Sequence, residues 1–111
     1  MIVMDFAERA ARNEEVFRSI NERIEEAAER HGRDVPLRLH CECGHASCFE
    51  TIDLMPDAYE RVSTSGHRFI VLPGHEEPKV ELIVERHDGW LIVEKVGEAR
   101  EQIDRDQENG G

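Results

Sequence analysis

The chain has 111 residues and carries 14 Lys and Arg side chains against 25 Asp and Glu side chains, which gives a formal net charge of −11 at pH 7. Such a surface repels phosphate backbones and anionic lipid headgroups, so we expect neither nucleic acid nor a membrane as a partner. Hydrophobic residues make up 39% of the chain and aromatic residues 5%, which predicts one domain with a modest apolar core that gains from an additional constraint.

The first predicted element is a long helix. Residues 5–31 contain no Pro or Gly, Asp5 and Glu8 have the spacing of a capping box, and Gly32 stands where a helix end favours glycine. Apolar residues recur every three, four or seven positions in a narrow stripe with one polar member: Phe6, Ala10, Asn13, Phe17, Ile20, Ile24 and Ala27. This stripe is typical of a helix packed lengthwise on its own domain, and also of paired helices. We therefore expect a homodimer or a protein partner bound through the N-terminal helix.

Strand patterns follow the helix. The segment "PLRLHCEC" alternates, which puts one set of side chains (Leu37, Leu39, Cys41 and Cys43) on one side and another (Arg38, His40 and Glu42) on the other. Extended structure resumes in "CFETIDL", and Pro56 suits the first turn of a short helix. The segments "RFIVLPG" and "KVELIVERHDGWLIVEK" are further strands, with "HDG" as a hairpin turn. The predicted fold class is α+β, with a long N-terminal helix, a small and mainly antiparallel sheet, a Cys-rich metal-binding turn and one short helix.

The chain divides into three predicted parts: an N-terminal helix over residues 1–32, a metal-binding α+β domain over residues 33–97, and a frayed or disordered acidic tail over residues 98–111. The N-terminus lacks a basic region followed by an apolar run, and the apolar stretches "FIVL" and "WLIV" are too short to span a bilayer. We expect a cytoplasmic protein, and in that reducing compartment clustered cysteines indicate metal binding before a disulfide.

All three cysteines lie within "CECGHASC", residues 41–48. Cys41 and Cys43 point the same way from an extended backbone, and the residues from Gly44 to Ser47 let the chain reverse so that Cys48 meets them. Zn²⁺ takes four tetrahedral ligands from thiolate and imidazole, so the pattern predicts a zinc site. The competing interpretations are three small thiols packed in the core, a redox-active thiol, and an iron–sulfur centre.

The fourth ligand must come from the six histidines. His75 is preferred, because it follows "LPG", where Pro73 and Gly74 form a tight turn at the end of a strand. His67 and His45 remain alternatives. A closed site of three thiolates and one imidazole leaves no position for a reactive water, so an enzyme is not expected. If His75 is not a ligand, Glu42 or Glu50 becomes a candidate base in an open metalloenzyme site.

Three segments carry a resemblance: "LHCECGHASCFETIDLMPDAYERV", "RFIVLPGHEEP" and "LIVEKVGEA". With these segments, the chain resembles a group of small uncharacterised bacterial proteins that have a CEC-x4-C block, a PGHE segment and a C-terminal VVEK-like strand. The resemblance covers residues 12–99 and includes "RNEEVFRSINERI"; His45 is the main departure from the pattern. It implies that Cys41, Cys43, Cys48 and His75 belong to the pattern of this group, and it implies no activity. The expected function is a structural zinc site in an interaction or regulatory module, and the alternative is a small metalloenzyme or an iron–sulfur or redox protein.

Overall fold

The computed structural model describes the backbone of residues 6–45, 47–97 and 101, and within it the side chains of residues 14–28, 30, 32–45, 47–97 and 101. Its elements in chain order are α1 (Phe6–His31), β1 (Leu37–His40), β2 (Thr51–Leu54), α2 (Pro56–Ser63), β3 (Arg68–Val71), β4 (Glu81–His87) and β5 (Trp90–Lys95). This order confirms the predicted α+β class, including the long first helix and the short second one. Asp5 of the predicted capping box lies outside the described residues, as does the predicted tail apart from Glu101.

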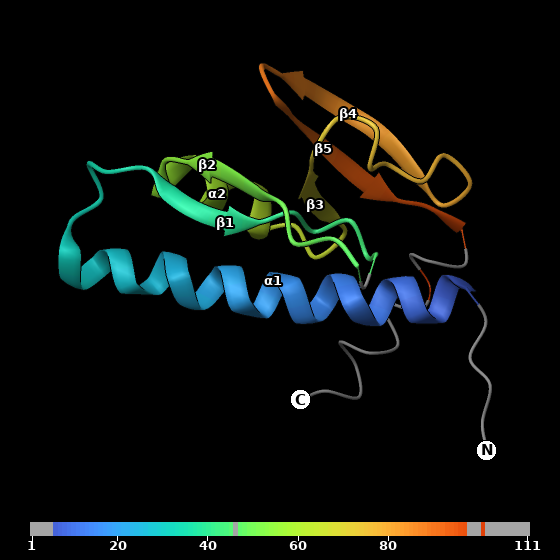
Figure 1. Ribbon diagram of the computed structural model, residues 1–111, viewed down its shortest axis with the longest axis horizontal. Coiled ribbons are helices and arrows are strands. Elements are labelled where there is room, and N and C mark those ends of the chain that lie inside the picture. The colour runs from blue at the N-terminus through green and yellow to red at the C-terminus, as the bar shows by residue number, and fades with distance from the viewer. Residues whose placement is uncertain (1–5, 46, 98–100, 102–111) are drawn as a thin grey trace.

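The strands form two antiparallel sheets where the sequence predicted one. β1 pairs with β2, with Leu39 opposite Ile52, while β5 lies between β3 and β4. The hairpin between β4 and β5 closes through Asp88 and Gly89, as the "HDG" segment predicted, and Gly89 takes the positive φ of 83° that such a turn requires. Figure 1 shows the two sheets side by side above α1, with the β1–β2 pair and α2 over its C-terminal half.

The chain passes from one sheet to the other at the cysteine segment. The backbone N–H of Cys41 still donates to the carbonyl of Glu50 in the extension of the β1–β2 pair, at 3.0 Å. The next residue changes partner, because the N–H of Glu42 donates to the carbonyl of Ile70 on β3, at 2.8 Å. The regular strand therefore ends at His40, and the Cys-x-Cys segment joins the two sheets.

Helix α1 lies along the whole molecule, but its packed face differs from the predicted stripe (Figure 1). The buried residues of its described part are Glu14, Arg18, Asn21 and Ala28, three of which are polar or charged. Phe17 and Ile24 are half-buried, whereas Ile20 is 44% exposed and Ala27 is exposed. Of the predicted stripe, Ile20 and Ala27 are thus not packed on the domain, and the side chains of Phe6, Ala10 and Asn13 lie outside the described residues.

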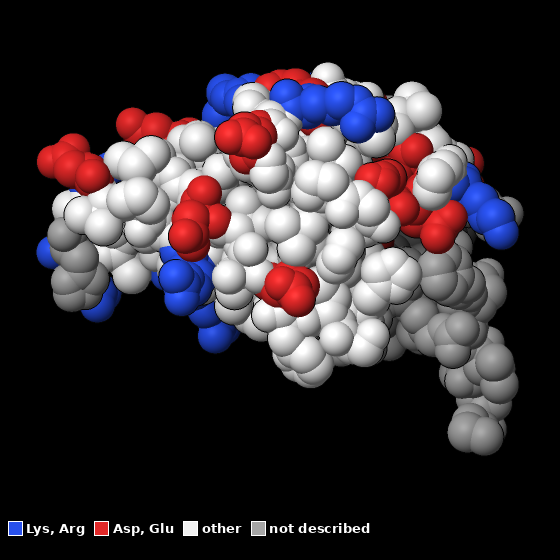
Figure 2. All heavy atoms as spheres, turned by 45° about the horizontal axis from the view of Figure 1, so that its top comes forward, with Lys and Arg blue, Asp and Glu red and all other residues white. Residues whose placement is uncertain are grey.

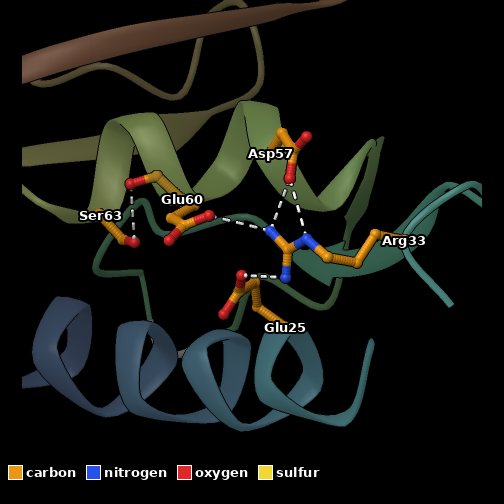
Figure 3. Close-up of polar contacts among 5 residues, drawn as sticks. All are labelled: Glu25, Arg33, Asp57, Glu60 and Ser63. Carbon is orange, nitrogen blue, oxygen red and sulfur yellow. Dashed lines mark hydrogen bonds and ion pairs between the residues drawn. The ribbon is translucent and has the colours of Figure 1, made fainter. Parts of the chain in front are cut away.

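Arg33 fixes the C-terminal end of α1 to α2 (Figure 3). Its guanidinium donates to Glu25 of α1 at 2.9 Å, to Asp57 of α2 at 2.7 Å and 2.9 Å, and to Glu60 of α2 at 2.9 Å. Both groups on α2 are well exposed, so solvent weakens these pairs. The pairs mainly set the course of the loop between α1 and β1.

Candidate metal centre

The turn that brings the cysteines together begins at Gly44, whose φ of 77° lies in the left-handed region that favours glycine. The chain then reverses, and the N–H of Cys48 donates to the carbonyl of His45 at 3.0 Å. Cys48 thus returns next to the Cys41 and Cys43 side chains, and all three thiols are buried. The predicted reversal between residues 44 and 47 is the observed one.

His75 reaches the same point from β3 through a second turn. The N–H of His75 donates to the carbonyl of Leu72 at 3.0 Å, and Gly74 has a φ of 88°. Proline followed by a glycine with positive φ is the pattern of a type II turn, which explains why "LPGH" directs the imidazole back toward the sheet. The side chain of Glu76 braces this turn by accepting a hydrogen bond from the N–H of Gly74 at 2.8 Å.

The structure brings four predicted ligands together: Cys41, Cys43, Cys48 and His75. Their ligand atoms all lie within 4.8 Å of one another, and this group could hold a metal ion. His75 Nδ1 lies 3.7 Å from the sulfur of Cys41 and 3.6 Å from that of Cys48. The alternative ligands His45 and His67 do not belong to this group of described residues.

These distances can be compared with those of a tetrahedral zinc site. Bonds of about 2.3 Å to sulfur and about 2.0–2.1 Å to nitrogen place a sulfur and a nitrogen ligand about 3.6 Å apart and two sulfur ligands about 3.8 Å apart. The measured separations of 3.6 Å and 3.7 Å between nitrogen and sulfur match the first value. These two separations are those expected of ligands that share one ion of this size.

Backbone N–H groups point at the sulfur atoms. The N–H of Leu72 donates to Cys41 Sγ at 3.3 Å. Backbone N–H groups of His45 and Glu50 donate to Cys43 and Cys48, and each bond favours the thiolate, although burial raises the pKa of Cys48 overall. Each cysteine thus has one backbone donor, and such donors stabilise the negative charge of a site with three thiolates.

The thiols differ in acidity. A hydrogen bond from Cys41 lowers the pKa of Cys43 to about 4, and the same bond, together with burial, raises the pKa of Cys41. Burial raises the pKa of Cys48. A bound cation would favour the thiolate form of all three side chains.

Glu42 occupies a position that the alternation of the sequence did not reveal. It lies between Cys41 and Cys43, is fully buried, and its carboxylate accepts three hydrogen bonds. The donors are Asn21 Nδ2 at 3.0 Å, the Tyr59 hydroxyl at 2.6 Å and the Ile70 N–H at 2.9 Å. Burial raises its pKa, against the lowering effect of these donors and of the Arg18 charge.

A cavity of about 350 Å³ opens beside the cluster. It is lined by two ligands and by the neighbouring loop: His45, Ser47, Cys48, Phe49, Glu50, Gly74 and His75. Glu50 faces this space, whereas Glu42 does not line it and is fully engaged in hydrogen bonds. The interpretation of Glu42 as a base beside a bound water is therefore not supported by its position.

Two further findings concern membrane spans and similarity to known proteins. Within the part of the chain that the structure describes, no helix combines the length and apolar character needed to cross a bilayer. Comparisons with protein-family models, with curated proteins and with solved structures found no significant match.

Proposed function

We propose that this chain is a small zinc-binding protein in which Cys41, Cys43, Cys48 and His75 hold one Zn²⁺ as a structural centre, and that it acts as an interaction or regulatory module. The observation that carries the proposal is the convergence of three sulfur atoms and one nitrogen within 4.8 Å. Four protein ligands complete a tetrahedral shell, which is typical of structural and not catalytic zinc.

The donor set supports zinc over the hard cations. Thiolate and imidazole are ligands of zinc and of other soft or borderline metals, whereas Ca²⁺ and Mg²⁺ prefer oxygen. The ion would join the cysteine turn, which connects β1 to β2, to the loop after β3, where His75 lies 34 residues from Cys41 and 27 residues from Cys48 in sequence. In a domain with few aromatic residues, such a link supplies the additional constraint that its core needs.

An iron–sulfur cluster is the second candidate, and the same distances count against it. The four ligands of an iron–sulfur cluster are shared among two or four iron atoms, so the cluster itself separates the ligand atoms that bind different irons. Ligand atoms within 4.8 Å of one another instead surround a space suited to one ion. A single bound metal is thus the better-supported arrangement.

Elemental analysis tests the metal assignment. We expect protein purified without added metal to contain close to one zinc atom per chain and to be colourless, because Zn²⁺ has a filled d shell. Absorption spectroscopy on the same sample checks for iron. A brown sample with stoichiometric iron would establish the second candidate, and a sample with no metal would remove the basis of the proposal.

The exposed apolar side chains support a role in binding proteins. Phe49, which follows the ligand Cys48 and lines the cavity beside it, is 82% exposed. Figure 2 shows acidic and basic side chains interspersed around a broad, mostly uncharged area on one face of the molecule. Aromatic anchors within a mixed polar surface are a common feature of protein interfaces.

We also propose that α1 forms a homodimer through the part of its stripe that its own domain leaves uncovered. Val16 is 56% exposed and Ile20 is 44% exposed, and Ile24 and Ala27 continue along the same side into an apolar groove of about 360 Å³. This groove also contains Val35 and Leu37. A two-fold, antiparallel pairing would place the projecting Val16 and Ile20 of each copy next to the groove of the other.

The double substitution Val16→Asp, Ile20→Asp is expected to weaken dimerisation at least about tenfold, because it removes two apolar side chains from the proposed interface and adds four charges to the dimer. Sedimentation equilibrium measures the effect. Ser19→Asp, on the same helix and exposed, is the matched control and should leave the dissociation constant unchanged. Wild-type protein that is monomeric at high micromolar concentration would contradict the homodimer.

A further inference from the structure

Helix α1 holds His40, the residue before the proposed ligand Cys41. Asn21 Oδ1 accepts a hydrogen bond from the His40 N–H at 2.7 Å, and Asn21 Nδ2 donates to the His40 carbonyl at 2.8 Å. The His40 ring also stacks on Phe17, with 4.0 Å between ring centroids. One turn of α1 thus fixes both the backbone and the side chain at the end of β1.

Asn21 also holds Glu42, the residue between the proposed ligands Cys41 and Cys43. Asn21 is fully buried, and its Nδ2 group also donates to Glu42 Oε2 at 3.0 Å. Glu42 in turn is bound by Tyr59 of α2 and by the backbone of Ile70 on β3. The carboxylate therefore connects three elements at the point where the backbone must present Cys41 and Cys43 on one side.

The apolar core makes little use of α1. The cluster of buried apolar residues comes from the strands, α2 and the cysteine turn. Among the described apolar residues of α1 only Ile24 packs against it, partly buried, while the Arg18 guanidinium lies over the ring of Phe69. The buried contacts of α1 are instead polar: Asn21 to His40 and Glu42, Glu14 to Lys95, and Arg18 to the Ser65 carbonyl. Its attachment depends on hydrogen bonds with strict geometry, and an unpaired buried partner is costly.

We infer that Asn21 is a positioning residue for the metal centre, acting through Glu42 and His40, so that metal binding and the docking of α1 form one linked equilibrium. The inference rests on the proposed function and extends it. The zinc site would stabilise its own turn and would also control the attachment of the N-terminal helix. When α1 is docked, the Cys-x-Cys backbone is held in its ligating form. When the metal is bound, that backbone presents Glu42 and His40 to Asn21.

If zinc binding and the docking of α1 are coupled, docking must strengthen zinc binding by the same factor by which zinc favours docking. Residues that orient metal ligands typically contribute about 10–100-fold to metal affinity. Asn21→Ala is therefore expected to weaken zinc binding at least about tenfold. Removing zinc should speed amide hydrogen exchange within residues 17–28 of α1 by at least the same factor.

Competition with a chromophoric chelator measures the zinc affinity, and mass spectrometry measures the exchange of α1 peptides with and without zinc. Ser19→Ala, which is on the same helix but exposed, is the matched control and should bind zinc like the wild type. Unchanged affinity in Asn21→Ala would overturn the inference. Equal exchange of α1 in the zinc-bound and chelated protein would also overturn it.

A reversed pair separates positioning from a general loss of stability. Asn21→Asp alone places a second carboxylate against Glu42 and should weaken zinc binding more than Asn21→Ala. Adding Glu42→Gln restores a donor to the contact with position 21, because the two hydrogens of the new amide can bond to that carboxylate and to the Tyr59 oxygen while its carbonyl accepts from Ile70. The His40 carbonyl loses its Asn21 donor in both variants, so their comparison isolates the contact with Glu42. The double variant should regain at least about tenfold in affinity over Asn21→Asp. No recovery would overturn the inference, and a wild type without bound zinc would overturn the proposed function as well.

Discussion

Cys43→Ser is expected to lower the melting temperature of the protein by about 15 °C or more and to abolish stoichiometric zinc binding. A serine hydroxyl does not supply a thiolate ligand, and a site that does not exist in the unfolded chain adds its binding free energy to folding. A loss of about 4 kcal/mol would be a large part of the stability of a domain of this size. Thermal unfolding followed by circular dichroism measures the shift.

The chelated wild type provides the internal comparison. Treatment with a strong chelator should lower its melting temperature close to that of Cys43→Ser, while the variant itself should not respond to the chelator. Ser47→Ala, an exposed residue of the same turn, should melt like the wild type. A Cys43→Ser protein that retains its zinc and melts within about 2 °C of the wild type would show that Cys43 is not a ligand.

The cluster could be predicted because local rules determine most of it. The spacing of Cys41, Cys43 and Cys48 places them on one short turn, and a turn is governed by nearby residues such as Gly44. His75 was found by the same kind of reasoning, since Pro73 and Gly74 direct the chain after β3. The additional information needed was that β3 lies beside the turn, as the hydrogen bond from Glu42 to Ile70 shows, and the spacing of the cysteines does not contain it.

The packed face of α1 could not be predicted in the same way. Apolar periodicity identifies the face that avoids water, and it correctly included Phe17 and Ile24. It cannot identify a face on which buried polar side chains find partners in other elements, as Asn21 does with Glu42. The burial of Glu42 could not be predicted for a related reason, because the regular strand ends at His40 and the next residues pair with two different sheets.

The wild type is expected to lose stability as pH rises from about 5 to 8, and the variant Glu14→Gln is expected to lack this loss. Lys95 is buried and its ammonium contacts two carboxylates, that of Glu14 on α1 and that of Glu81 on β4. Burial raises the pKa of Glu14 from 4.5 to about 8, and the nearby charges of Glu81 and Glu42 act in the same direction, whereas Lys95 lowers it. The folded protein therefore holds a proton on Glu14 that the unfolded chain releases at lower pH.

The sign of the effect follows from this difference in proton binding. Between the unfolded value of 4.5 and the folded value of about 8, the folded state binds one more proton than the unfolded chain. Its free energy of unfolding therefore falls by up to about 1.4 kcal/mol per pH unit. This contribution is fully present below the unfolded pKa and is lost as pH rises through the folded pKa. Glutamine resembles the protonated acid at every pH, so the variant lacks this slope.

The measurement is the free energy of unfolding of both proteins from pH 5 to 9 in urea, with zinc content held constant. The difference between the two curves cancels the opposite trend of the thiolates, which bind metal more weakly as pH falls. Relative to the variant, the wild type should lose about 2 kcal/mol between pH 6 and pH 8. Glu26→Gln, an exposed position of the same helix, should follow the wild type. If Glu14 is instead ionised throughout and paired with Lys95, Glu14→Gln would lower stability by a similar amount at every pH above 5, and the two curves would run parallel.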